Sequence, residues 1–234
     1  MDFKKFLKWL SRAFGNFLLS LAVTLFIFSF FASAFFNNLD TLKNNLINEL
    51  STDESLSLLL NVDVKQVREL CDKNPNTEEC KQLDSIKEQF SDNPEINNLI
   101  NKIKSYSKYV FTLRLITLIF FVLGFLFIFL GSEFSLLRTM EKVSFSIAIS
   151  SLLAVVYYKF FPKIFESVLN YPDIQGKLRD YPDVIVEKIE KIILDWLNLL
   201  INNVFKIAII LTVVFALVFI FLKVYERKKN KERI

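Results

Sequence analysis

The sequence contains no histidine, and only four of its 234 residues are glycine. Without histidine, the chain lacks the side chain that most often acts as a general base near neutral pH. The glycines stand alone at positions 15, 124, 131 and 176, so none belongs to a phosphate-binding loop. The two cysteines do not supply the four ligands of a structural zinc site. We therefore expect no enzymatic activity, no catalytic residue, no cofactor and no metal site.

Apolar residues, in contrast, are abundant: 53% of the chain is hydrophobic and 26 residues are phenylalanine. Four runs are long enough to cross a bilayer as helices, namely 17–36, 110–130, 143–161 and 204–222. Asp and Glu are absent from all four, which excludes intramembrane acid pairs and the usual proton relays. The first run follows a basic start and precedes Ala32-Ser33-Ala34, as in a cleavable signal peptide. Because it is longer than a signal core, we expect it to be retained as a membrane helix.

The charges between the runs predict an orientation. Segments 1–16, 131–142 and 223–234 hold 12 Lys and Arg in 40 residues, whereas segments 37–109 and 162–203 hold 14 in 115. The segments denser in Lys and Arg are expected on the cytoplasmic side, which places both termini inside. Of the 25 acidic residues, 20 lie in the two extracytoplasmic segments, so the predicted exterior is net negative. The basic tail suits anionic headgroups, and nucleic-acid binding is not expected because no aromatic stacking platform accompanies its charges.

These features predict an all-α integral membrane protein with a bundle of four membrane helices. The segments outside the runs are a cytoplasmic amphipathic segment (1–16), two extracytoplasmic helical segments (37–109 and 162–203), a cytoplasmic turn (131–142) and a basic cytoplasmic tail (223–234). We expect a multi-pass protein of the cell membrane. About half of the chain lies in the two extracytoplasmic segments in this scheme, which is too much for simple connecting loops.

Several membrane helices are expected to extend into the exterior. From Asn93-Pro94-Glu95 to Leu130 the pattern predicts one uninterrupted helix, amphipathic first and then almost wholly apolar. The first membrane helix is expected to continue as an amphipathic stripe to Leu50. A repeat, Tyr171-Pro172-Asp173 and Tyr181-Pro182-Asp183, predicts two helix starts, and the second helix runs on into the last membrane run.

Cys71 and Cys80 lie in the first extracytoplasmic segment, where an even number of cysteines predicts a disulfide. Ser51-Thr52-Asp53-Glu54 predicts a helix end followed by a new N-cap. Asp63 is placed to cap a helix through Leu70, and Thr77 to cap another that carries Leu83, Ile86 and Phe90. The disulfide would then staple a helical hairpin over residues 63–90.

The third run carries small residues at helical spacing: Ser144, Ala148, Ser151 and Ala154. Small residues allow membrane helices to approach closely, so we expect this helix to be the most enclosed of the four. The alternative is that the serines line a polar path.

Three cations lie at the outer margins of the runs: Arg114, Lys159 and Lys206. The simplest interpretation is that they extend to the headgroups or pair with exterior acids such as Glu166 and Asp195. Arg114 is the deepest, and if it faces the bundle it would bind an anionic lipid or line a vestibule.

The layout, with inside termini and a large first exterior segment, resembles that of tetraspan families, and the Cys71-to-Cys80 spacing is compatible with the claudin pattern. The tryptophans that precede the claudin cysteines and the Cys-Cys-Gly motif of tetraspanins are absent, so no family function is carried over. We expect a non-enzymatic protein that contacts membrane lipid and whose exterior helical domain is an interaction, scaffolding or adhesion surface for a protein partner or a second copy. The alternative is a subunit of an oligomeric channel or transporter, with the second and third runs lining the path.

Overall fold

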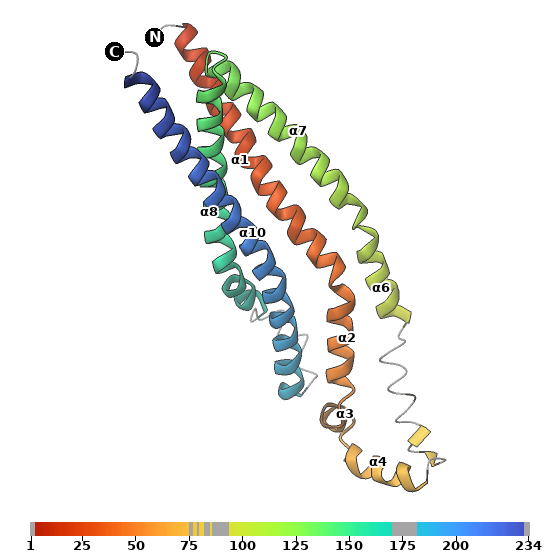
Figure 1. Cartoon of the computed structure of the whole chain (residues 1–234). Coiled ribbons are helices and arrows are strands. Elements are labelled where there is room, and N and C mark those ends of the chain that lie inside the picture. The colour runs from red at the N-terminus through yellow and green to blue at the C-terminus, as the bar shows by residue number, and fades with distance from the viewer. Residues whose placement is uncertain are drawn as a thin grey trace. The chain divides into compact units, whose positions relative to one another are not determined.

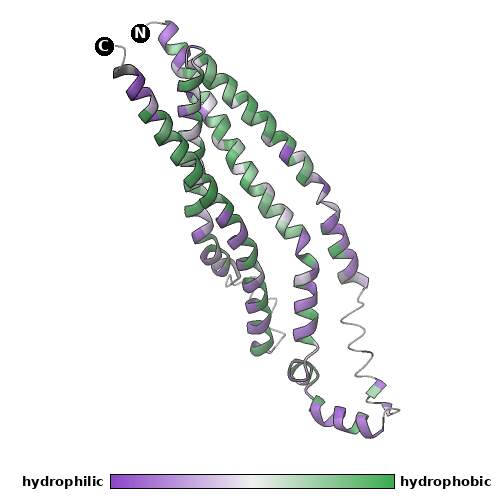
Figure 2. Cartoon of the chain, viewed as in Figure 1, coloured by the Kyte–Doolittle hydropathy of each residue, from purple (hydrophilic) through white to green (hydrophobic). Residues whose placement is uncertain are grey.

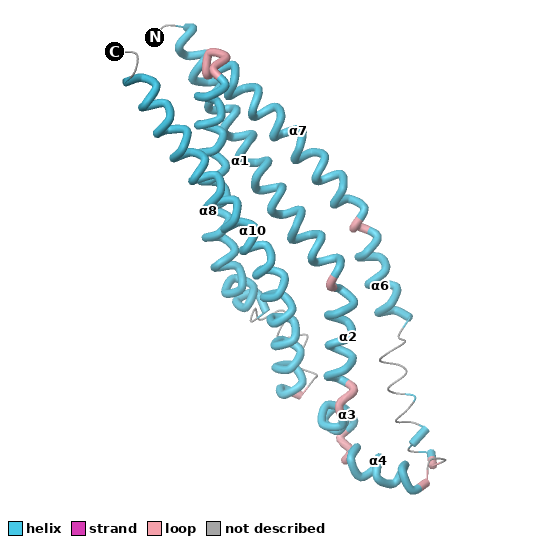
Figure 3. Tube along the Cα trace, viewed as in Figure 1, coloured by secondary structure: helices cyan, strands magenta, loops and turns pink. Residues whose placement is uncertain are grey.

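The computed structural model describes residues 3–74, 77, 78, 80, 81, 85, 94–169 and 182–231. Almost all of these residues are helical, and none of them lies in a strand (Figures 1 and 3). The helices are α1 (Phe3–Asn37), α2 (Leu39–Leu50), α3 (Asp53–Leu60), α4 (Val64–Lys73), α6 (Pro94–Ser105), α7 (Lys108–Gly131), α8 (Leu136–Leu169) and α10 (Asp183–Lys231). The expectation of an all-α chain is confirmed.

Four helical stretches within the described residues are long and apolar enough to cross a membrane, as the sequence predicts. They are Phe3–Asn37, Asn97–Gly131, Leu136–Ser167 and Asp183–Lys229. In the most apolar part of α8, 39% of the residues are buried, against 33%, 17% and 6% in the first, second and fourth stretches. The expectation that the third helix is the most enclosed is therefore confirmed.

The chain divides into two compact units, which we call the apolar unit and the polar unit. The apolar unit consists of Met1–Ala34, Ser107–Phe161 and Leu200–Ile234, and the polar unit of Phe35–Tyr106 and Pro162–Leu199. Figure 2 shows the difference in hydropathy: α7 is almost entirely hydrophobic, whereas α2, α4 and α6 carry many hydrophilic residues.

In the apolar unit, α1 and α7 form an antiparallel pair with a close approach of the two backbones. A Cβ atom added to Gly124 would lie 3.0 Å from the backbone oxygen of Gly15, and one added to Gly15 would lie 2.9 Å from that of Gly124. Nearer the start of α1, the Ser11 hydroxyl donates a hydrogen bond to the Phe127 carbonyl (2.7 Å). The Arg12 Nε donates to the Gly131 carbonyl (2.6 Å). Glycine allows this approach because it has no side chain to separate the helices.

A second antiparallel pair in this unit is formed by α8 and α10. Arg138 forms an ion pair with Glu226 (3.6 Å), and Glu141 forms one with Lys223 (2.7 Å). One turn further along α8, the rings of Phe145 and Phe219 lie 5.2 Å apart. Because residues later in α8 meet residues earlier in α10, the two helices run in opposite directions.

Two predicted continuous helices are interrupted. The predicted helix from Asn93 to Leu130 is found as the helical stretch Asn97–Gly131, but a turn at Tyr106–Ser107 divides it into α6 and α7 (Figure 3). There the Tyr106 N–H donates to the Ile103 carbonyl (3.0 Å) and the Val110 N–H to the Ser107 carbonyl (3.0 Å), so the chain makes i→i+3 bonds in place of α-helical ones. The predicted amphipathic continuation of the first membrane helix to Leu50 is helical, but a turn at Asn38 separates α1 from α2.

In the polar unit, short capped helices follow one another as the sequence predicts. Thr52 caps α3 by accepting a hydrogen bond from the Ser55 N–H, and Asp63 caps α4 by accepting from two backbone N–H groups. Leu56 of α3 and Val64 of α4 form a small buried core. The predicted Cys71–Cys80 disulfide is present.

The first part of α10 also belongs to the polar unit. This helix begins at Asp183, directly after Pro182, which confirms the second of the two predicted helix starts. The Trp196 Nε1 donates a hydrogen bond to the Asn38 carbonyl (2.9 Å), and its ring lies 5.3 Å from that of Phe35. The first predicted start, at Tyr171-Pro172-Asp173, lies outside the described residues, as do Leu83, Ile86 and Phe90 of the proposed hairpin.

Candidate functional site

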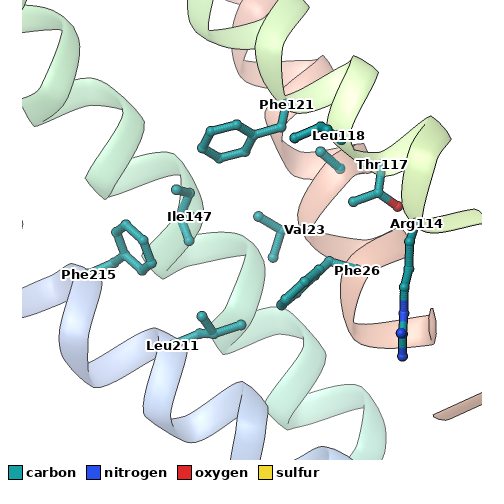
Figure 4. A pocket seen from close by; sticks show the side chains of 10 residues that line it. Val23, Phe26, Arg114, Thr117, Leu118, Phe121, Ile147, Leu211 and Phe215 are labelled. Carbon is teal, nitrogen blue, oxygen red and sulfur yellow. The ribbon is translucent and has the colours of Figure 1, made fainter. Parts of the chain in front are cut away.

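A groove in the apolar unit is lined by all four long helices: α1, α7, α8 and α10 (Figure 4). Its volume is about 380 Å³. The lining side chains are Ala22, Val23, Phe26, Arg114, Thr117, Leu118, Phe121, Ile147, Leu211 and Phe215. Eight of these ten are apolar, so the groove is suited to hydrocarbon rather than to water.

Arg114 is the charged member of this lining set. It lies on α7, six residues after Lys108, where that helix begins. Its guanidinium carbon lies 5.6 Å from the centre of the Phe30 ring, a cation–π geometry. The side chain is exposed, and Figure 4 shows it at the edge of the lining set. None of the ion pairs found among the described residues includes Arg114.

Thr117, the other polar residue of the lining, does not offer a free hydroxyl hydrogen. Its Oγ1 donates to the Leu113 carbonyl at 2.8 Å, one turn earlier in the same helix. Thr117 therefore presents mainly its methyl group and a weak acceptor. Arg114 dominates the electrostatics of the groove.

The other two predicted cations, Lys159 and Lys206, do not join Arg114. Both side chains are exposed, and neither belongs to the lining of the groove. The expected partners Glu166 and Asp195 form no ion pair with them among the described residues. The three cations therefore lie at separate sites, and of the three only Arg114 lines the groove.

A second cavity, of about 390 Å³, lies between α1 and α8. It carries more hydroxyl groups than the first, from Ser20, Thr24, Ser150, Tyr157 and Tyr158. The Thr24 hydroxyl donates to the Ser20 carbonyl (2.9 Å) within α1. No residue of α7 belongs to the lining of this cavity.

The small-residue stripe of α8 lies on the packed side of that helix. Ser144 and Ser151 are buried, and Ala148 and Ala154 are half-buried. The Ser151 hydroxyl has no hydrogen-bond partner among the described residues. The sequence pattern predicts this stripe but does not reveal Gly15, where an added Cβ atom would lie 2.9 Å from two backbone atoms of α7.

Ion pairs lie around the turn between α7 and α8. Lys8 pairs with Glu133 and lowers the pKa of that carboxyl, mainly through a hydrogen bond. Lys142 donates a hydrogen bond to the Ser132 hydroxyl (3.3 Å). The pKa of Lys142 is lowered, mainly by partial burial and secondly by repulsion from Arg12. The Lys8–Glu133 pair connects the start of α1 with the turn between α7 and α8.

The polar unit has its own electrostatic cluster around Lys188. The Lys188 ammonium lies 2.9 Å from the Glu54 carboxylate and 3.1 Å from the Glu49 carboxylate. Hydrogen bonds to Glu54 and Glu49 raise the pKa of Lys188, and the hydrogen bond from Lys188 lowers the pKa of Glu54. The cluster connects α10 to α2 and α3 through ion pairs.

Comparison with known proteins adds no further assignment. No protein-family model, curated protein or solved structure matches this chain. Among the described residues, no group of three or more His, Cys, Asp or Glu is gathered to hold a metal ion.

Proposed function

We propose that the chain is a non-enzymatic, multi-pass protein of the cell membrane, and that its polar unit is an extracytoplasmic interaction surface. In this proposal α1, α7, α8 and α10 cross the bilayer, with both termini in the cytoplasm. The polar unit contains most of the predicted extracytoplasmic residues and the Cys71–Cys80 disulfide. A disulfide is typical of an oxidising compartment, which agrees with the orientation that the Lys and Arg distribution favours.

The observation that carries the proposal is that the polar unit is a folded body rather than a set of connecting loops. It has a buried core at Leu56 and Val64, and Ile185 is buried on α10. The Lys188 cluster and the Trp196 hydrogen bond connect α10 to the helices that precede it. Helices held in fixed positions by such contacts present a defined surface, which recognition requires and a loose linker does not provide.

The net negative charge of the extracytoplasmic segments indicates the chemistry of a partner. An acidic surface attracts a basic one, and such attraction weakens as salt screens it. We therefore propose a protein partner, or a region of one, with a basic surface. The polar unit also exposes apolar side chains that are able to contribute contact area, among them Val62 and Leu70.

The topology is tested by labelling single introduced cysteines in intact cells with a membrane-impermeant maleimide. Leu99→Cys, on exposed α6, should be labelled directly, whereas Lys228→Cys in the tail should be labelled only after the membrane is permeabilised. The native cysteines, held in a disulfide, should not react without reductant. The opposite pattern at the two introduced positions would refute the orientation.

The interaction is tested by photo-crosslinking in native membranes, with a reactive amino acid at Leu70 of the polar unit. The matched control is Leu217 of α10, which is equally exposed, at 61%. We expect a discrete adduct from Leu70 that decreases as salt is raised, and no such adduct from Leu217. An equal set of adducts from both positions would contradict a specific surface on the polar unit.

The alternative, a channel or transporter subunit with α7 and α8 lining the path, remains a second proposal. The cavity between α1 and α8 is lined by several hydroxyl groups, which favours a polar path through the bundle. However, no residue of α7 lines this cavity, and the alternative requires α7 to line the path. Cysteine accessibility separates the two: the buried positions Ser144 and Ser151 should resist labelling in a scaffold. Labelling of Ser144→Cys or Ser151→Cys by a water-soluble maleimide would instead support a path.

A further inference from the structure

Among the residues that the structure describes, no acidic side chain pairs with Arg114 to compensate its charge within a membrane. A charged side chain within a span is costly, so such residues normally pair with an opposite charge or reach the interface. The four apolar runs contain no Asp or Glu, and the ion pairs of the described residues do not include Arg114. The ring of Phe30 offers only a weak cation–π contact. Since no described acidic side chain fills this role, an anion from outside the chain is the candidate partner.

The position of Arg114 indicates where that anion lies. Under the proposed topology, Arg114 is four residues inside the outer end of the run 110–130, which corresponds to a depth of about 6 Å. Lipid phosphates of the outer leaflet lie just beyond such a depth, within reach of an extended arginine side chain. The planar guanidinium binds phosphate through paired hydrogen bonds, which a lysine ammonium does not reproduce.

The groove beside Arg114 has the chemistry of an acyl-chain site. Its remaining lining is apolar except for Thr117, whose hydroxyl hydrogen is already bonded within α7. Its volume of about 380 Å³ lies in the range of small-molecule sites. We propose that this groove binds one outer-leaflet anionic phospholipid, with its phosphate on Arg114 and an acyl chain along Val23, Phe121 and Phe215. The proposal rests on the membrane topology given above.

Other occupants fit the groove less well. A span from a second copy of this chain would cover the apolar surface but would bring no carboxylate, since all four runs lack Asp and Glu. Water would meet a mainly hydrocarbon lining, where it finds few hydrogen-bond partners. A phospholipid satisfies both the guanidinium and the apolar walls.

The test uses the full chain, purified in detergent, incubated with equal parts phosphatidylglycerol and phosphatidylcholine and examined by native mass spectrometry. We expect one phosphatidylglycerol molecule to remain bound to the wild type. Arg114→Gln should lower its occupancy about tenfold or more, because charge-assisted hydrogen bonds are lost. Arg114→Lys should retain part of the binding. Lys206→Gln is the matched control, because it removes the same charge at the same membrane margin but outside the groove, and it should leave the occupancy unchanged.

A second variant tests the acyl chain separately. Leu118 lines the groove and is 58% exposed, so Leu118→Trp fills the groove without disturbing the buried core. We expect this variant to lose bound lipid, and an excess of inorganic phosphate not to displace lipid from the wild type. Displacement by phosphate alone would overturn the acyl-chain assignment.

The proposal is also overturned if Arg114→Gln binds as much lipid as the wild type, or if Lys206→Gln loses as much as Arg114→Gln. A dimer that retains no lipid would show that a second copy covers the groove instead. Failure of the topology would appear independently, in the maleimide labelling of Leu99→Cys and Lys228→Cys, and so is distinguishable from failure of the lipid site.

Discussion

The close approach of α1 and α7 makes a direct prediction for Gly124. A Cβ atom at this position would lie 2.9 Å from Leu19 Cγ, 3.0 Å from the Gly15 backbone oxygen and 3.0 Å from the Leu19 backbone nitrogen. Carbon atoms prefer separations of about 3.5–4.0 Å, so a side chain here requires the helices to move apart by about half an ångström. Two of the three contacts are backbone atoms, which cannot turn away as a flexible side chain would.

Two opposing effects set the magnitude. Replacing glycine by alanine or leucine in a helix gains about 0.8–1 kcal/mol of helix propensity. Overpacking a tight contact costs about 1–3 kcal/mol. For Gly124→Ala the net destabilisation is therefore about 0–2 kcal/mol, and for Gly124→Leu it is about 2 kcal/mol or more. In a chain of this length, a loss of 2 kcal/mol corresponds to a fall in Tm of about 4–8 °C.

The assay is thermal unfolding in detergent micelles, followed by tryptophan fluorescence. Thr112→Leu is the control, because it also enlarges a side chain on α7 but at an exposed position, where no overpacking is expected. Gly15→Ala combined with Gly124→Ala should be less destabilising than the sum of the single changes, since both act on one contact. If Gly124→Leu unfolds at the same temperature as Thr112→Leu, or if the double change is simply additive, the glycine contact does not hold the pair together.

Three further predictions concern the polar unit. Reduction of the Cys71–Cys80 disulfide releases a short loop, which should destabilise the local fold by about 2.5–3 kcal/mol and should appear as new protease cleavage in that region. Trp196→Phe removes the indole hydrogen bond at a buried site and should cost about 1 kcal/mol in thermal unfolding, whereas an unchanged Tm would argue against that bond. The pKa of Glu54 is lowered from 4.5 by the hydrogen bond and charge of Lys188, so its stabilisation is present above pH 4.5 and is lost as the pH falls through the lowered pKa. Glu54→Gln should therefore flatten the dependence of Tm on pH in that acid range, by a small amount because the pair is exposed.

Local signals in the sequence predict much of the helical architecture. Asp63 and Thr52 are N-caps in the structure because their side chains accept from the first free backbone N–H groups, a contact made within three residues. Pro182 precedes the start of α10 for a similarly local reason, since proline fits the entry to a helix. The four apolar stretches follow from composition and length alone. In each case the cause lies within one segment, so the segment is sufficient to predict it.

Contacts between residues of different helices cannot be predicted from one segment in this way. The spacing of Ser144 and Ser151 correctly indicates a packed face of α8, but nothing local to Gly15 shows that it meets Gly124, more than a hundred residues later. A single glycine in an apolar helix has no periodic partner to mark it. The one indication in the sequence is that glycine is rare. The chain has four glycines, and three of them lie in α1 or α7. The groove beside Arg114 requires four helices to assemble and so was not predicted, although Arg114 itself was.

The turn at Tyr106–Ser107 shows why a missing helix breaker does not guarantee a continuous helix. No proline or glycine lies between Pro94 and Gly124, and the apolar spacing continues through the turn. The turn keeps its backbone bonded through i→i+3 hydrogen bonds, so it loses little of the helical hydrogen bonding. It also lies where the polar unit ends and the apolar unit begins. The interruption therefore falls where the chain passes from one compact unit into the other, a boundary that hydrophobic spacing alone does not mark.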